Sequence, residues 1–125
     1  MKLGIVVLSH GSRTCAGEPD QVVLQISAMI RERTGGVLVE AAVLNRLSGL
    51  QTMDQAVEKL VSKGADRITV APMVFSNGRH IRQDIPEEIA ALRKQYPGVA
   101  IAVAGPIGAD PRVADILMER IREVQ

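Results

Sequence analysis

The sequence predicts a single α/β domain, with a βαβαβαβα order that forms a four-stranded parallel sheet with helices on both faces. Four short runs rich in Val, Ile, Leu and Ala alternate with segments of helical periodicity. The runs are almost continuously apolar, as in strands that are covered on both faces. Strand starts recur about every thirty residues, the size of one βαβ unit. The length of 125 residues fits one domain covering 1–125.

The first half of the chain is predicted to contain two strands, each followed by a helix. The first helical pattern stops before Gly35-Gly36 and the second at Gly64, because glycine favours the end of a helix. Helical spacing places the apolar residues of each segment on one stripe. The strands are Leu3–Ser9 and Val37–Leu44. The first stripe is Val22, Ile26 and Ile30, with Val23 and Met29 beside it, and the second is Met53, Ala56, Val57, Leu60 and Val61.

The second half repeats this arrangement. Asp84 and Pro86 are predicted to mark the start of the third helix, and the turn Pro97-Gly98 follows its end. Asp110-Pro111 supplies an N-cap and a first-turn proline for the last helix. The strands are Arg67–Ala71 and Val99–Ala104, and the stripes are Ile85, Ile89, Leu92 and Tyr96, then Val113, Ile116, Leu117, Ile121 and Val124.

Composition excludes several classes of protein. The net charge of +1 and the two aromatic residues argue against nucleic-acid binding, which needs a basic face. No apolar run approaches the length of a membrane span, and Leu3–Leu8 is too short for a signal-peptide core. The single thiol, Cys15, cannot form an intrachain disulfide, which favours a reducing compartment. We therefore expect a cytoplasmic protein that binds neither membranes nor nucleic acids.

The functional residues are expected at the carboxyl ends of the strands, where open parallel sheets bind ligands. Both histidines of the chain, His10 and His80, fall in these segments. His10 has three open interpretations: a loop histidine held by backbone hydrogen bonds, a metal ligand, or a general base. The segments are Ser9–Ala16, Asn45–Gln51, Pro72–His80 and Gly105–Asp110.

Other residues of these segments also have both a plain and a functional interpretation. Gly11 and Gly78 are turn glycines, or they let the backbone approach a ligand closely. Phe75 either ends a buried strand or forms part of an apolar wall, and Cys15 is interpreted as a plain loop thiol. Four arginines would together form a cationic rim suited to carboxylates or phosphates. They are Arg13, Arg46, Arg79 and Arg82.

Several common motifs are absent. The sequence contains neither of the standard glycine-rich nucleotide loops, no G-x-S-x-G elbow, and no H-E-x-x-H or paired-cysteine zinc pattern. The standard nucleotide, serine-hydrolase and zinc sites are therefore unsupported.

Three segments resemble the short CbiX-type class II chelatases. Leu8–Arg13 resembles the "GHGSR" start of that family, and Met73–Pro86 resembles its "FL-x-x-GRH-x-x-x-DIP" segment. Gly105–Arg112 is similar to its "P-x-G-x-D-P-R" segment. The resemblance covers essentially the whole chain, and the GRH…DIP segment is its most specific part. It implies a chelatase-like, flavodoxin-like fold.

The resemblance also implies an activity. This family inserts a divalent metal into sirohydrochlorin or a related tetrapyrrole, with Co²⁺ expected first and Fe²⁺ or Ni²⁺ as alternatives, and with no prosthetic group. By the same resemblance His10 and His80 are the catalytic residues and the metal-binding pair, His10 is the proton acceptor, and two copies form a homodimer. The expected substrate-binding residues are Arg13, Asn45, Arg46, Phe75, Ser76, Asn77, Gly78 and Arg79.

One departure from the family pattern keeps other functions open. Many members have an acidic residue where Asn45 stands, and an amide can neither take up a proton nor neutralise a dication. A carrier that binds metal or tetrapyrrole without turnover is therefore an alternative. Phosphoryl transfer through His10 is another, although Ser9 stands where an arginine would be expected for it.

Overall fold

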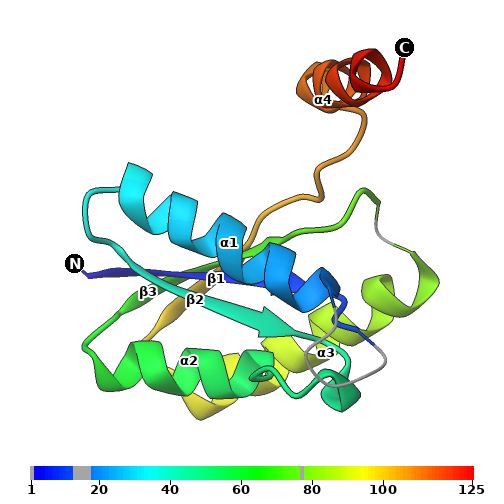
Figure 1. Cartoon of the computed structure of the whole chain (residues 1–125). Coiled ribbons are helices and arrows are strands. Elements are labelled where there is room, and N and C mark those ends of the chain that lie inside the picture. The colour runs from blue at the N-terminus through cyan, green and yellow to red at the C-terminus, as the bar shows by residue number, and fades with distance from the viewer. Residues whose placement is uncertain (1, 13–17, 77) are drawn as a thin grey trace.

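The computed structural model describes residues 2–12, 18–76 and 78–125 (Figure 1). Strands and helices alternate as predicted, with strand bounds within one residue of the prediction. No helix in these ranges is long and apolar enough to cross a bilayer. The elements are β1 (Leu3–Ser9), α1 (Glu18–Arg33), β2 (Leu38–Val43), the 3₁₀ helix η1 (Arg46–Ser48), α2 (Met53–Ser62), β3 (Arg67–Pro72), α3 (Arg79–Gln95), β4 (Ala100–Val103) and α4 (Pro111–Glu123).

The strands form one four-stranded sheet in the order β2-β1-β3-β4. All neighbouring pairs are parallel, and Leu8 near the end of β1 lies opposite Ala42 of β2 and Pro72 of β3. The predicted fold class is confirmed. Because the strands run in one direction, the loops that follow them share one edge of the sheet.

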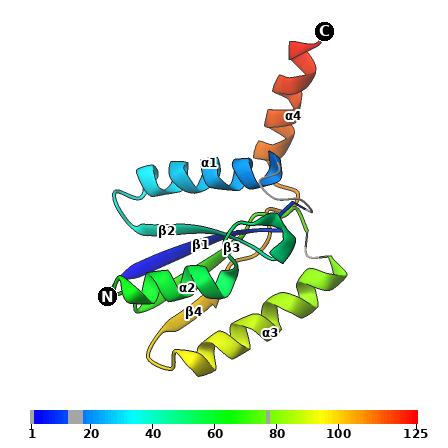
Figure 2. The same ribbon diagram turned by 60° about the horizontal axis from the view of Figure 1, so that its bottom comes forward.

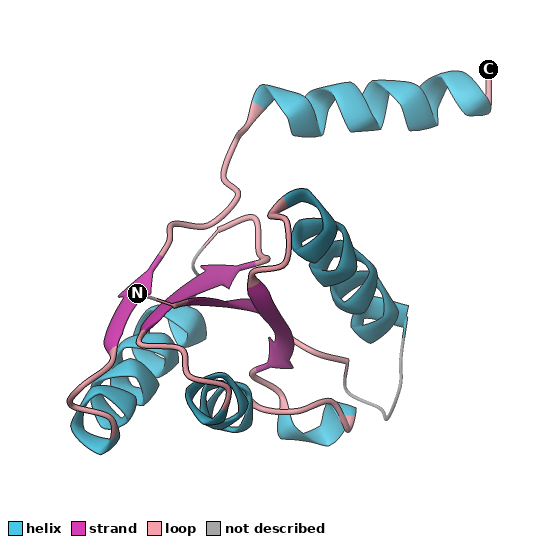
Figure 3. Ribbon diagram, turned by 90° about the vertical axis from the view of Figure 1, so that its left-hand side faces the viewer, coloured by secondary structure: helices cyan, strands magenta, loops and turns pink. Residues whose placement is uncertain are grey.

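Helices cover the two faces of this sheet unequally. α1 lies on one face over β1 and β2, and α2 and α3 lie on the other face (Figures 1 and 3). The larger core cluster lies on the side of α2 and α3 and includes Leu60, Ile68 and Ile89. A smaller cluster contains Val23 of α1 and Val39 of β2. The prediction of helices on both faces therefore holds, with most of the core on one side.

The predicted core stripes are correct for α2 and α3 and only partly correct for α1. Met53, Ala56, Val57 and Leu60 of α2 are buried, as are Ile85, Ile89 and Leu92 of α3. In α1, Ile26 and Ile30 of the predicted stripe are partly buried, but Val22 of the same stripe is exposed. Of the two residues predicted beside the stripe, Val23 is buried and Met29 is exposed. Because α1 packs over only two strands, a narrower part of its surface is covered.

The last helix does not pack on the sheet at all. α4 projects away from the body of the protein (Figure 2), and none of its residues is buried. The prediction that its apolar stripe faces the core is wrong for the single chain. β4 is correspondingly exposed, since Ile101 is its one buried residue.

The third helix begins earlier than predicted. α3 starts at Arg79, with Gly78 as its N-cap, so Pro86 lies inside the helix rather than at its start. An interior proline removes one helical hydrogen bond and costs about 3 kcal/mol. The burial of Ile85 and Ile89 on either side of it offsets this cost. His80, predicted at the end of a loop, therefore belongs to the first turn of α3.

Candidate active site

His10 follows β1 directly, and its side chain is exposed at the carboxyl edge of the sheet. Its carbonyl oxygen accepts a hydrogen bond from the Asn45 N–H at 2.9 Å. The preceding carbonyl, of Ser9, accepts one from the Leu44 N–H at 3.0 Å. The loop after β1 is thus fixed to the loop after β2, which brings His10 and Asn45 together.

The close approach of these two loops requires glycine at position 11. Gly11 has φ +89°, in the left-handed region that side chains disfavour. A Cβ atom there would lie 2.9 Å from Cβ of Val43 and 3.3 Å from Cβ of Asn45. Glycine is therefore needed here for packing against the end of β2 and the loop after it, whereas the predicted close approach to a ligand stays a prediction.

The buried carboxylate of Asp20, which was not predicted as a site residue, binds Ser12, the residue after Gly11. Asp20, in the first turn of α1, is fully buried and Ser12 is nearly so. Oδ1 of Asp20 accepts the Ser12 N–H at 3.0 Å, and Oδ2 accepts the Ser12 hydroxyl at 2.8 Å. An acidic residue in the first turn of a helix also suits the helix dipole. Its place in the first turn of a predicted helix was the one feature of the sequence that could have indicated Asp20. The Asp20 side chain fixes the segment that follows His10.

Asn45 acts as a helix cap as well as a neighbour of His10. It is the N-cap of η1, and its Oδ1 accepts the Leu47 N–H at 3.0 Å. Arg46 starts η1, and Gly49 ends it with φ +87°. One of the two lone pairs of the Asn45 oxygen is therefore already used, which weakens its ability to act as a metal ligand.

The loop after β3 lies beside the segment after β4. The Val74 carbonyl accepts the Ile107 N–H and the Phe75 carbonyl accepts the Gly108 N–H, both at 2.8 Å. Phe75 and Ser76 are exposed, and Gly78 then caps α3. The two predicted binding residues Phe75 and Ser76 thus lie at the same edge as His10.

Several predicted site residues fall outside what the structure describes. Arg13, Cys15 and Asn77 lie outside the described ranges. Of Arg46, Arg79 and His80, the backbone is described and the side chain is not. The backbone of His80 lies in the first turn of α3, after the strand that neighbours β1. His10 and His80 therefore belong to segments that start from adjacent strands.

Exposed apolar side chains surround this edge. Leu47 is 71% exposed, Phe75 63% and Ile107 41%, and they follow β2, β3 and β4 respectively. Phe75 was predicted, whereas Leu47 and Ile107 were not. Only their place in loops at the carboxyl edge could have indicated them. Together they offer apolar contact area to a bound molecule.

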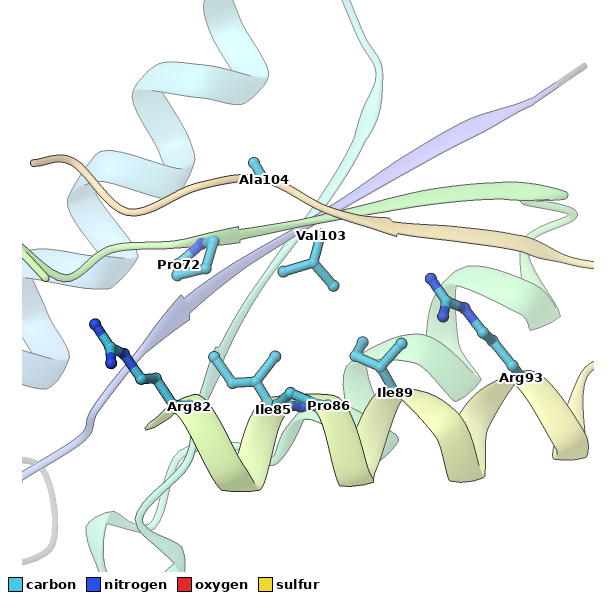
Figure 4. A pocket seen from close by; sticks show the side chains of 8 residues that line it. All are labelled: Pro72, Arg82, Ile85, Pro86, Ile89, Arg93, Val103 and Ala104. Carbon is cyan, nitrogen blue, oxygen red and sulfur yellow. The ribbon is translucent and has the colours of Figure 1, made fainter. Parts of the chain in front are cut away.

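A groove of about 350 Å³ runs between α3 and the end of the sheet at β4. Figure 4 shows Arg82 at one end of it and Arg93 at the other, with Ile85, Ile89 and Val103 between them. The guanidinium of Arg93 donates to the Ile101 carbonyl at 2.7 Å. Arg82 is exposed, and no carboxylate among the described residues pairs with it. Four arginines were predicted to form the cationic rim, and the structure describes the side chain of one of them, Arg82.

Asp110 and Arg112 form an ion pair with three hydrogen bonds. Arg112 donates from Nε to Oδ1 at 2.8 Å, from Nη2 to Oδ2 at 2.7 Å, and from its backbone N–H to Oδ1 at 2.9 Å. These hydrogen bonds hold the pKa of Asp110 well below its usual range and raise the pKa of Arg112. Asp110 is the N-cap of α4, as predicted.

The described residues contain no cluster of three or more His, Cys, Asp or Glu side chains that could hold a metal ion. Within those residues His10 is the exposed imidazole at this edge, because the side chain of His80 is not described.

Sequence comparison identifies the family. The sequence model of the CbiX family matches residues 4–124. The sirohydrochlorin cobaltochelatase of Sulfurisphaera tokodaii is 35% identical over 121 residues, which cover 97% of this chain and 92% of that protein. The sirohydrochlorin ferrochelatase of Priestia megaterium is 34% identical over 95% of this chain, but the match spans only 43% of that longer protein.

Solved structures agree with this assignment. SirB from Bacillus subtilis with Fe³⁺ superposes with a TM-score of 0.85 at 29% identity, over 99% of this chain and 48% of SirB. A CbiX protein from Marinobacter aquaeolei superposes with a TM-score of 0.70 at 28% identity, over 97% of this chain and 95% of that one. Some relatives thus match this chain along almost their whole length, and others are about twice as long. This chain belongs to the CbiX family.

Proposed function

We propose that this chain is a sirohydrochlorin chelatase that inserts a divalent metal ion into the macrocycle. One observation carries the proposal: the exposed His10 and the segment that contains Arg79-His80 follow adjacent strands, β1 and β3, at the same edge of the sheet. Several relatives that are matched along most of their own length bear the name sirohydrochlorin cobaltochelatase. A site at the carboxyl edge is also where an open parallel sheet binds its ligands.

The reaction makes three physical demands. Two pyrrole protons must leave, the metal must lose bound water, and the macrocycle must bend so that its nitrogens face the metal. We assign the proton transfer to His10, because a neutral imidazole accepts a proton near neutral pH and His10 is open to solvent. His10 and His80 together are the proposed metal ligands. Two imidazoles leave coordination positions free for the ring nitrogens, so the metal can be passed on.

Charge and apolar contact would hold the substrate. Sirohydrochlorin carries many carboxylates, and exposed arginines bind carboxylates with charge-assisted hydrogen bonds. Arg82 is the described arginine that fits this role, and Arg13, Arg46 and Arg79 are proposed to complete the rim. Leu47 and Phe75 would contact the apolar face of the macrocycle.

The metal is proposed to be Co²⁺, with Fe²⁺ and Ni²⁺ as further candidates. Relatives of both kinds occur: the protein of S. tokodaii is named a cobaltochelatase and that of P. megaterium a ferrochelatase. Imidazole nitrogen binds all three ions, and their intrinsic affinities rise from Fe²⁺ through Co²⁺ to Ni²⁺. The type of ligand therefore does not select one of the three ions, and the rates of insertion must be measured to identify the metal.

We propose further that the active protein is a homodimer. This chain matches 48% of SirB, so a second copy would supply the counterpart of the other half. The described part of one chain presents His10, Leu47 and Phe75 as one exposed wall. A large flat substrate needs a second wall to exclude water.

The test is a metal panel with sirohydrochlorin as substrate, followed by the absorbance change on insertion. Co²⁺ is expected to react fastest, and His10→Ala should lower the rate of insertion at least about 100-fold, as expected for a lost general base. Met29→Ala, a substitution of an exposed residue near the end of α1 that is far from this edge, is the control and should keep full activity. Full activity of His10→Ala would refute the proposal.

A carrier function is the second candidate, and one observation favours it. The oxygen of Asn45 is engaged with the Leu47 N–H, and an amide provides no carboxylate to assist metal transfer. A carrier would bind cobalt or sirohydrochlorin, as measured by calorimetry, and show no turnover with any metal of the panel.

A further inference from the structure

Helix α4 has an apolar stripe that its own chain leaves uncovered. Ile116 is 50% exposed, Leu117 57%, Ile121 47% and Val124 85%, and no residue of α4 is buried. These residues recur with helical spacing and therefore share one side of the helix. A contiguous apolar face of this kind marks an interaction surface.

The sheet has an uncovered area of complementary character. Ile101 and Val70 point toward α3, into the larger core cluster. Side chains alternate along a strand, so Ala100 and Ala102 point to the opposite face, and both are exposed. α1 lies on that face but covers β1 and β2, not β3 and β4 (Figure 3). We call this area, formed by β3 and β4 on the α1 side, the alanine face.

The alanine face suits a helix. Its side chains are small, and small residues let a helix approach a sheet closely. The other face of the sheet is covered by two helices, α2 and α3, whereas this face carries only α1 in the described part of the chain. α4 has 13 residues and is about 20 Å long at 1.5 Å per residue. Such a helix is long enough to cross both strands.

The segment before α4 leads the helix away from the alanine face of its own chain. Backbone hydrogen bonds from Ala104 to Val70, and from Ile107 to Val74, both at 2.8 Å, hold this segment beside β3 and the loop after it. Asp110 then caps α4 through the Arg112 N–H at 2.9 Å. The extended segment and the preformed cap set the direction in which α4 projects (Figure 2).

We infer that α4 crosses to a second copy of this chain and packs its apolar stripe on the alanine face there, while the partner's helix does the same in return. Each copy has one helix without a covering surface and one surface without a helix. A two-fold exchange satisfies both at once, because the same patches meet on both subunits. The inference rests on the proposed dimer and specifies how its two subunits are joined.

The exchange would connect dimer formation to the active site. The segment that carries α4 is hydrogen-bonded to the carbonyl oxygens of Val74 and Phe75, next to the proposed substrate loop. Exchange of α4 would therefore hold that loop in place from the partner's side. Dissociation would release the helix and leave the loop held by its own chain alone.

The direct test detects contacts between chains. Equal amounts of ¹³C-labelled and unlabelled protein are mixed, and isotope-filtered NOE spectra report only contacts between different copies. The inference predicts contacts from the methyl groups of Ile116, Leu117 and Ile121 to those of Ala100 and Ala102. A dimer in which these contacts are absent, or occur only within one chain, would overturn the exchange and leave the proposed function standing.

A matched pair of variants tests the same surface. Leu117→Glu and Arg122→Gln each lower the net charge by one, but they lie on different sides of α4. Leu117→Glu should weaken dimerisation roughly 100-fold, because it places an unpaired charge in an apolar contact. Arg122→Gln should leave dimerisation unchanged. Sedimentation velocity over a concentration series measures both.

Folding of the variants is checked separately. α4 contributes no buried residue to its own chain, so a dissociated Leu117→Glu variant should keep the folded body and its circular dichroism spectrum. A Leu117→Glu variant that dimerises as tightly as the parent overturns the inference. A parent protein that stays monomeric at all concentrations overturns both the exchange and the proposed dimer, but not metal insertion itself.

Discussion

Asp20 holds Ser12 at two points: one carboxylate oxygen accepts the Ser12 N–H at 3.0 Å and the other accepts its hydroxyl at 2.8 Å. Both residues are buried, so neither bond has water as a substitute. This pair joins the first turn of α1 to the residue two positions after His10. The position of the segment that contains His10 therefore depends on a carboxylate that is itself buried.

Asp20→Ala should therefore destabilise the protein by about 1–3 kcal/mol, because two buried donors of Ser12 lose their acceptor. Chemical denaturation measures this change. Combining it with Ser12→Ala gives a double-mutant cycle, in which the two changes should be clearly less than additive. Full additivity would show that the pair is not coupled.

Gly11→Ala should destabilise more than two other glycine substitutions. Position 11 combines φ +89° with a Cβ contact of 2.9 Å to Val43. Gly35→Ala shares the positive φ, at +68°, without any neighbour within 4 Å, and Gly98→Ala has neither feature.

The three substitutions thus separate strain from steric contact. The loss of stability should increase in the order Gly98→Ala, Gly35→Ala, Gly11→Ala, with about 1 kcal/mol or more for position 35 and a larger loss for position 11. Thermal unfolding gives the order. An equal loss at positions 11 and 35 would mean that the contact with Val43 relaxes freely.

Phe75→Ala should reduce substrate binding without reducing stability. Phe75 is 63% exposed, so its removal changes the free energy of unfolding by no more than about 0.5 kcal/mol. The KM for sirohydrochlorin should rise several-fold because apolar contact is lost. Met29→Ala, at an exposed position 49% accessible and near the far end of α1, is the control and should change neither quantity.

Arg82→Ala should raise the KM for sirohydrochlorin by roughly tenfold, the equivalent of one charge-assisted hydrogen bond. The kcat should change little, because Arg82 is proposed to bind carboxylates rather than to move protons. Added salt should weaken the parent more than the variant. Arg93→Ala is the comparison: its guanidinium is bound to the Ile101 carbonyl, so its loss should lower stability.

Acid should loosen the start of α4 only at low pH. The hydrogen bonds from Arg112 hold the pKa of Asp110 below its usual range. A carboxylate with a lowered pKa stabilises the folded state above its unfolded pKa, and this contribution is lost as the pH falls through the folded pKa. An NMR titration should find the Asp110 midpoint well below 3.8, the value of a free aspartate. Arg112→Ala should move it back toward that value.

Local patterns were enough to predict most elements. The strands are found within one residue, and the cap at Asp110 is where the sequence places it. The predicted start of α3 was wrong because Pro86 is a strong local signal for the start of a helix. In the structure the helix continues past Pro86, because burial of Ile85 and Ile89 stabilises it. Asp20 was missed for a related reason: its partner, Ser12, precedes it by eight residues and meets it only through the fold.

By itself the sequence determined the order of strands and helices, the parallel sheet and the edge at which both histidine-bearing segments lie. These follow from residue periodicity and from the direction of parallel strands, which are local or topological properties. Only the tertiary structure decided that α4 leaves its own sheet and that Leu47 and Ile107 are exposed at the same edge of the sheet as His10. An apolar stripe indicates that a helix packs against another surface. It does not indicate which surface, because the hydrophobic effect is non-directional. The backbone hydrogen bonds of the segment before α4 determine the direction in which the helix projects.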